Sequence, residues 1–378
     1  MHHKTQVNKE GEMSKKELIV LLLTVFIVSG FGFSKKNDNS AMFRGGLERT
    51  GVYHTKGPHK LPELKWKFTT RNMVESSPAV SDGVVYFGSL DKCLYAVNIK
   101  TGQEKWKFTT GNIIYSSPAI SDGVVYFGSH DNCLYAVNIK TGLEKWKFKT
   151  GGWLASSPAV SDGVVYFGSD DNCLYAVDIK AGQKKWKFKT GSQVGSSPAV
   201  SDGVVYFGSY DRCLYAVDIK TGQKKWKFRT GSNILSSPAV SDGVVYFGSR
   251  DKCLYAVDIK TGQEKWKFRT ESEIWSSPAV SDGVVYFGSH DTCLYAVNIK
   301  TGLEKWKFKT PRGATSSPAV SDGVVYLGSF DKCLYAVDIK TGQEKWKFRT
   351  GSNILSSPAV SDGVVYFGSH DNCLYAIR

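Results

Sequence analysis

Residues 76–97 read SSPAVSDGVVYFGSLDKCLYAV, and this stretch decides the fold because nearly the same letters return every 40 residues. Further copies begin at Ser116, Ser156, Ser196, Ser236, Ser276, Ser316 and Ser356. A fixed period of this length indicates a repeat architecture, in which each unit is one supersecondary element packed on the next. The 378-residue chain is therefore not read as two or three ordinary domains.

Each unit contains four predicted β-strands. In the second copy they are 116–120, 124–128, 133–139 and 145–150. Val, Tyr, Phe and Trp favour strands, and Asp122-Gly123 between the first two is a strong hairpin signal. Pro118 lacks a backbone donor, which suits an edge strand. The pattern predicts an all-β protein built from four-stranded units.

The two ends of the repeat region predict that these units close into a ring. Residues 64–70 form an outer strand with no inner strands before it, whereas the last copy, 356–378, has three inner strands and no outer one. Pairing the two completes an eighth unit, whereas an open solenoid would need polar caps that the sequence lacks. We expect an eight-bladed β-propeller with four-stranded blades over 63–378, closed by an N-terminal outer strand that completes the last blade.

The segment before the propeller predicts export. Residues 1–34 read as a polar extension and then a signal peptide or N-terminal anchor, because Lys15 and Lys16 precede an apolar stretch over 18–33. Residues 35–62 are a lead-in to the first strand. We expect a secreted or cell-envelope protein that touches a membrane only through the N-terminal segment.

The net charge of +14 raises the possibility of a nucleic-acid partner. Much of the excess lies in the recurrent Lys-Trp-Lys-Phe pattern, as at 145–148, where alternation places the rings on one side and the lysines on the other. Lysines on an outer strand discourage edge-to-edge pairing of sheets. Nucleic acid is therefore not the expected partner, and a polyanion-binding rim is kept as the alternative.

Eight cysteines, from Cys93 to Cys373, fall once per repeat at the same place. Equivalent points in neighbouring blades should lie too far apart for a disulfide. We expect buried free thiols that pack as small apolar side chains.

The segment 96–106, AVNIKTGQEKW, resembles the tryptophan-docking motif A-x-D-x-x-T-G-x-x-x-W of the PQQ-like repeat family. That family includes eight-bladed quinoprotein dehydrogenases and the BamB outer-membrane assembly lipoproteins. Residues 42–46 and 50–51 are also similar to the start of its secreted members. The resemblance implies the propeller fold but no single function. It also implies that one tryptophan per repeat packs between adjacent blades: Trp66, Trp106, Trp146, Trp186, Trp226, Trp266, Trp306 and Trp346.

Within the repeat, variation gathers at two places. The first is the residue before the aspartate of the turn between the second and third strands, Asp91 in the first copy, and it differs between most copies. The second is the loop that joins the fourth strand to the first strand of the next repeat, which also differs between most copies. We number the four strands of each repeat 1 to 4, so that the 2–3 loop joins the second strand to the third and the 4–1 loop joins the fourth strand to the first strand of the next repeat. Counting strand reversals places both kinds of loop on one face, with the 4–1 loops leading to the mouth of the central channel. The candidate binding residues on this face are Arg71, Tyr115, His130, Trp153, Asp170, Tyr210, Arg250, Glu273, Trp275, His290, Arg312, Phe330 and His370.

These substitutions include Trp, Tyr and Arg, which are enriched at binding hot spots. We predict a monomeric, non-enzymatic, exported binding scaffold that engages a protein or glycan partner through the variable face. Drift after blade duplication is the competing explanation, and the identical loops 232–235 and 352–355 favour it. An architectural cell-surface repeat protein is a further alternative.

The resemblance also implies a rival of another class, a PQQ-dependent quinoprotein oxidoreductase, for which Glu273, Trp275 and Arg312 come nearest to the expected set. The chain lacks the adjacent cysteine pair and the long insertions typical of those enzymes. The ring of turn aspartates at Asp91 and its equivalents is expected to cap backbone rather than hold Ca²⁺. His130, His290 and His370 are expected to be exposed loop residues. We therefore predict no catalytic residue, cofactor or metal.

Overall fold

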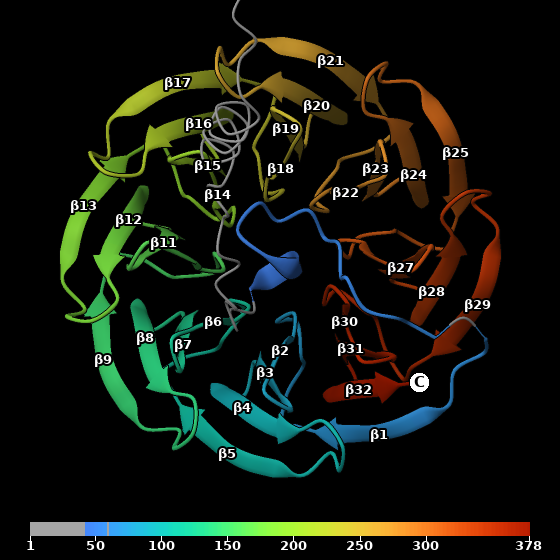
Figure 1. Cartoon of the computed structure of the whole chain (residues 1–378), viewed down its shortest axis with the longest axis horizontal. Coiled ribbons are helices and arrows are strands. Elements are labelled where there is room, and N and C mark those ends of the chain that lie inside the picture. The colour runs from blue at the N-terminus through green and yellow to red at the C-terminus, as the bar shows by residue number, and fades with distance from the viewer. Residues whose placement is uncertain (1–41, 59) are drawn as a thin grey trace, which may run out of the picture. The chain divides into compact units, whose positions relative to one another are not determined.

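The eight copies form eight four-stranded antiparallel sheets arranged as the blades of a ring (Figure 1). The computed structural model describes residues 42–58 and 60–378, so the predicted signal segment and polar extension lie outside the described residues. Within the described chain, no helix is long and apolar enough to cross a membrane. The all-β propeller predicted from the repeat is confirmed.

Each blade runs from a short inner strand to a longer outer one. In chain order, blades 1 to 4 contain β2 (Ala79–Ser81), β3 (Val84–Gly88), β4 (Cys93–Asn98) and β5 (Glu104–Thr109); β6 (Ala119–Ser121), β7 (Val124–Gly128), β8 (Cys133–Asn138) and β9 (Glu144–Lys149); β10 (Ala159–Ser161), β11 (Val164–Ser169), β12 (Cys173–Asp178) and β13 (Lys184–Lys189); β14 (Ala199–Ser201), β15 (Val204–Gly208), β16 (Cys213–Asp218) and β17 (Lys224–Arg229).

Blades 5 to 7 contain β18 (Ala239–Ser241), β19 (Val244–Gly248), β20 (Cys253–Asp258) and β21 (Glu264–Arg269); β22 (Ala279–Ser281), β23 (Val284–Gly288), β24 (Cys293–Asn298) and β25 (Glu304–Lys309); β26 (Ala319–Ser321), β27 (Val324–Gly328), β28 (Cys333–Asp338) and β29 (Glu344–Arg349). Blade 8 contains β30 (Ala359–Ser361), β31 (Val364–Ser369), β32 (Cys373–Ile377) and, from the other end of the repeats, β1 (Leu64–Thr69).

Blade 8 closes the ring as predicted. Strand β1 pairs antiparallel with β32, with Phe68 opposite Leu374. Just beyond this ladder, the backbones of Glu63 and Arg378 exchange two hydrogen bonds of 2.7 and 2.9 Å. The outer strand of the last blade is therefore supplied by the beginning of the repeat region.

The first strand of each blade is shorter than expected: β6 covers Ala119–Ser121 rather than 116–120. The two serines before it bond to the neighbouring blade instead. Ser116 Oγ donates to Ser156 O at 3.1 Å, and Ser117 N donates to Ser157 Oγ at 3.0 Å. These contacts tie the inner ends of adjacent blades together around the channel.

The apolar core lies between adjacent blades. Val124 and Tyr126 of blade 2, for example, pack with Val165 and Phe167 of blade 3, and all four are buried. The cysteines take part in the same packing: all eight are free, and every one except the half-buried Cys93 is buried. The prediction of free, packed thiols is confirmed.

The tryptophan motif packs between blades as the resemblance implies. Trp106 Nε1 donates to Ile139 O of the next repeat at 3.0 Å. Its ring lies on Gly142, where an added Cβ would come within 2.8 Å of the indole and where φ is +70°. Asn138 Oδ1 accepts from the backbone of Lys140 and Thr141, which holds the turn that presents this glycine. Trp346 is the exception, because it donates to Pro58 O of the lead-in at 3.0 Å.

Residues 42–58 of the lead-in cross the centre of the ring on the way to β1 (Figure 1). A single 3₁₀ turn, η1 (Phe43–Gly45), is followed by a backbone that accepts hydrogen bonds from Val200, Val240, Val280 and Val320 on the inner strands. The buried guanidinium of Arg49 donates to Ser157 O at 2.9 Å and to Pro158 O at 3.1 Å. Burial lowers the pKa of Arg44 and of Arg49 to about 9. The lead-in thus links blades that are far apart in sequence.

Candidate functional site

An aspartate at each 2–3 turn holds the variable loops together through hydrogen bonds. Asp131 Oδ1 accepts from Cys133 N at 3.1 Å, while Oδ2 accepts from Tyr135 OH at 2.7 Å and from Gly111 N at 2.8 Å. Because residue 111 belongs to the preceding 4–1 loop, this carboxylate joins the two variable loops of one blade. The expectation that these aspartates cap backbone is confirmed.

A backbone bond fixes the variable residue itself. His130 N donates to Ile113 O at 3.0 Å, and Arg250, His290 and Phe330 make the equivalent bond to their own 4–1 loops. The 2–3 and 4–1 loops therefore meet on one face, as counting strand reversals predicts. We call the thirteen candidate binding residues on these loops the mouth surface.

On blades 2 and 3 the mouth surface carries an aromatic stack. The His130 ring lies between Tyr115 and Trp153, with centroid separations of 4.8 Å to each, and it is stacked on Trp153 at 11°. Trp153 nevertheless keeps 53% of its surface exposed. His130 is half-buried, and burial lowers its pKa.

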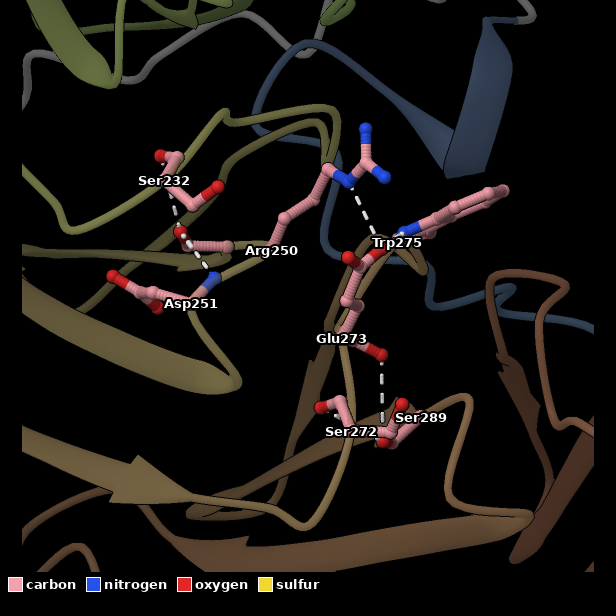
Figure 2. Close-up of polar contacts among 8 residues, drawn as sticks. Ser232, Arg250, Asp251, Ser272, Glu273, Trp275 and Ser289 are labelled. Atoms are coloured by element: carbon pink, nitrogen blue, oxygen red, sulfur yellow. Dashed lines mark hydrogen bonds and ion pairs between the residues drawn. The ribbon is translucent and has the colours of Figure 1, made fainter.

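On blades 5 to 7 a second group forms around one carboxylate (Figure 2). Glu273 Oε2 accepts from Arg250 Nε at 2.9 Å and from Trp275 Nε1 at 2.6 Å. Partial burial opposes ionisation of Glu273, but the hydrogen bonds from Arg250 and Trp275 lower its pKa overall. The Trp275 ring lies 4.1 Å from His290, and His290 meets the edge of Phe330 at 6.0 Å. Five predicted residues are thus in one connected cluster.

The remaining mouth residues are more dispersed. Asp170 is half-buried, and burial together with Asp171 raises its pKa. Burial, with a smaller effect of Asp170, raises the pKa of Tyr210. Arg71 and Arg312 are exposed.

The prediction of exposed histidines is wrong for all three. His130, His290 and His370 are half-buried, because their backbone bonds to the 4–1 loops draw the rings against loop side chains. His370 Nε2 lies 3.0 Å from Glu75 Oε1. Sequence reasoning missed Glu75, and its only signal was its place in a variable 4–1 loop.

The mouth surface does not provide the donors that a quinone cofactor with Ca²⁺ requires. Ca²⁺ takes six to eight oxygen ligands, whereas the Glu273 carboxylate already pairs with Arg250 and Trp275. No three His, Cys, Asp or Glu side chains of the described residues gather as a metal site. Of the residues nearest to the quinoprotein set, Glu273 and Trp275 bond to each other and Glu273 pairs with Arg250, whereas Arg312 is exposed on another blade.

The fold and the docked tryptophans define a β-propeller of PQQ-like repeats. The sequence profile of the family described as outer membrane protein assembly factor BamB matches residues 63–153, 146–236 and 230–377. The chain belongs to this family, which confirms the resemblance seen in its sequence. No curated protein matches it in sequence.

Solved structures share the fold. BamB from Moraxella catarrhalis is 18% identical with a TM-score of 0.74, over 84% of this chain and 100% of that one. A europium-containing methanol dehydrogenase is 14% identical with a TM-score of 0.79, over 90% and 98%. A computationally designed protein, Ika8, is 24% identical with a TM-score of 0.74, over 82% and 96%. At these identities the similarity concerns the fold alone.

Proposed function

We propose that the chain is a non-enzymatic, exported binding scaffold that engages a protein or glycan partner through the mouth surface. The observation that carries this proposal is Trp153. Its indole is held in place by stacking on His130, yet 53% of its surface faces solvent. A large aromatic ring that is both fixed and exposed can bind a partner with little further loss of side-chain freedom.

The second aromatic group has the same character. Trp275 is 37% exposed, and its ring is fixed by a hydrogen bond to Glu273 while the Arg250 guanidinium lies 5.4 Å from the ring centroid. Trp and Arg are the side chains most enriched at binding hot spots. Drift in the loops would explain the sequence variation, but it gives no reason for these side chains to order one another.

The family description supports a protein partner and an extracytoplasmic location, since it names outer-membrane protein assembly. The apolar stretch over 18–33 agrees with export. As a monomer, the scaffold would present one mouth surface per molecule.

The proposal is tested by site-specific photo-crosslinking in the native envelope, with the reactive group placed at position 153 or at position 140 on the opposite face. We expect a defined adduct from 153 and none from 140. The adduct partner is then purified and its affinity measured. Trp153→Ala and Trp275→Ala should each weaken binding by about 2 kcal/mol, roughly 30-fold.

Lys140→Ala is the control, because Lys140 lies on a turn that repeats almost unchanged around the ring. It should leave the affinity unchanged. Loss of binding in Lys140→Ala, with both tryptophan variants binding normally, would refute binding through the mouth surface. It would favour sequence drift in these loops and a polyanion bound by the repeated lysines.

A further inference from the structure

Blade 7 carries a cavity that continues from the mouth surface. It has a volume of about 330 Å³, and its lining includes Arg312, Phe330, Asp331, Lys332, Lys347 and Arg349. This volume is at the lower end of the range for small-ligand sites, roughly 300–1,000 Å³. Two of these residues, Arg312 and Phe330, belong to the mouth surface.

The cavity has an excess of positive charge. Four basic side chains line the cavity, whereas Asp331 supplies the only carboxylate among its lining residues. One of the four, Lys347, also lies with its Nζ 3.8 Å from Glu344 Oε1. Arg312 is specific to this blade, because the equivalent positions hold Asn, Gly or Ser. A guanidinium with neighbouring ammonium groups favours a carboxylate or phosphate ligand.

Asp331 differs from the turn aspartates of the other blades. In those seven blades Oδ2 accepts from the backbone N–H of the first residue of the 4–1 loop, at Arg71, Gly111, Gly151, Gly191, Gly231, Glu271 and Gly351. In blade 7 that residue is Pro311, which has no N–H. Asp331 still accepts from Cys333 N at 3.0 Å and from Tyr335 OH. Oδ2 of Asp331 therefore lacks the loop N–H donor that the other seven aspartates have, and a ligand hydroxyl can donate to it instead. Pro311 also lines the cavity.

An apolar ring completes the set. Phe330 is half-buried, with its backbone bonded to Gly313 O at 3.2 Å and its ring against the Gly313 backbone. Gly313 allows this close approach, since an added Cβ would lie 3.1 Å from the Phe330 ring. A flat apolar ring, a hydroxyl acceptor and several cations are thus gathered around one cavity.

We propose that this cavity binds an anionic sugar residue, of which a hexuronic acid is the simplest example. A sugar hydroxyl donates to Asp331, the C–H face of the sugar lies on Phe330, and the anionic group pairs with Arg312 and the neighbouring bases. This rests on the proposed function and narrows it, because it assigns a glycan to one part of the mouth surface.

The test measures binding of a galacturonic acid tetramer to the full chain by calorimetry, beside a neutral galactose tetramer of the same linkage and inorganic phosphate. We expect the acidic tetramer to bind at least tenfold more tightly than either control. Arg312→Ser should weaken it about tenfold, and it should fold normally because Ser occupies this position in four other blades. Pro311→Gly should also weaken it, because the restored N–H competes for Asp331.

A matched pair of arginine variants tests whether the net charge of the protein alone accounts for binding. Arg349→Thr and Arg269→Thr each remove one cation and install the residue found at position 109 of blade 1. Only Arg349 lines the cavity. Arg349→Thr should therefore weaken binding severalfold, while Arg269→Thr should not change it.

Equal losses in both arginine variants, equal binding of phosphate, or equal binding of the neutral tetramer would each overturn the anionic-sugar site. Failure of this proposal is separable from failure of the proposed function. If a protein partner is lost in Trp153→Ala but retained in Arg312→Ser, and the acidic tetramer does not bind, the binding scaffold stands and the sugar site is refuted.

Discussion

Replacing Trp66 by Ala tests how the ring is closed, because this side chain joins the first blade to the last. Its Nε1 donates to Ile99 O of blade 1 at 2.9 Å, and its ring lies 5.9 Å from that of Tyr366 in blade 8. The indole also covers Gly102, where an added Cβ would come within 2.8 Å of it. Trp66→Ala therefore removes contacts on both sides of the seam.

The size of the effect follows from the burial of Trp66. Truncating a fully buried Phe or Trp to Ala costs about 3–5 kcal/mol, and Trp66 is half-buried, so roughly half of that applies, about 2 kcal/mol. The lost hydrogen bond adds about 1 kcal/mol. We expect a local loss of about 3 kcal/mol, which is a change of roughly 150-fold in the opening equilibrium.

Native-state hydrogen exchange measures this loss, because it resolves opening of individual strands in a repeat protein whose global unfolding need not be two-state. Amides of β32 and β4 should exchange faster in Trp66→Ala. Trp226→Ala is the matched variant, since Trp226 makes the same contact to Ile259 O at 2.9 Å. It should cause a similar loss in blades 4 and 5, and Lys65→Ala, on the exposed side of β1, should cause little.

The reasoning is refuted if exchange in β32 is unchanged in Trp66→Ala while Trp226→Ala has its expected effect. That result would mean that the seam does not depend on the same tryptophan contact as the other blade junctions. Equal effects at both sites would support a ring in which the seam is an ordinary junction.

Three further predictions concern other parts of the molecule. Deleting residues 1–70 should lower the melting temperature and expose β32 to exchange first, and an unchanged melting temperature would contradict the closure. Ala181→Thr should stabilise its turn by about 0.5–1 kcal/mol, because Thr Oγ1 accepts from the Gln backbone in equivalent turns, as in Thr221 and Gln223; denaturant unfolding measures this. Burial lowers the pKa of His130, so stability should fall as the pH drops below about 6.5, and His130→Phe should reduce that slope.

Much of the fold could be predicted from the sequence because the physical information is local and repeated. Asp122-Gly123 predicts a hairpin from conformational preference alone, and both residues have positive φ, 50° and 71°. The unmatched outer strand at 64–70 and the unmatched inner strands at 356–378 predicted closure, which the pairing of β1 with β32 confirms. The docking of the tryptophans between blades was implied by the resemblance to the PQQ-like repeat motif.

Other features depend on contacts between residues far apart in the chain, so only the tertiary structure decided them. Arg49 reaches Ser157 and Pro158, and Trp346 docks on the Pro58 carbonyl of the lead-in, 288 residues earlier in the chain. The half-buried state of His130 likewise depends on Tyr115 and Trp153, which come from two successive 4–1 loops. The residues that repeat in every copy determine the structure of a blade through local preferences. The side chains that differ between blades come into contact only when the closed ring brings the loops together around one channel.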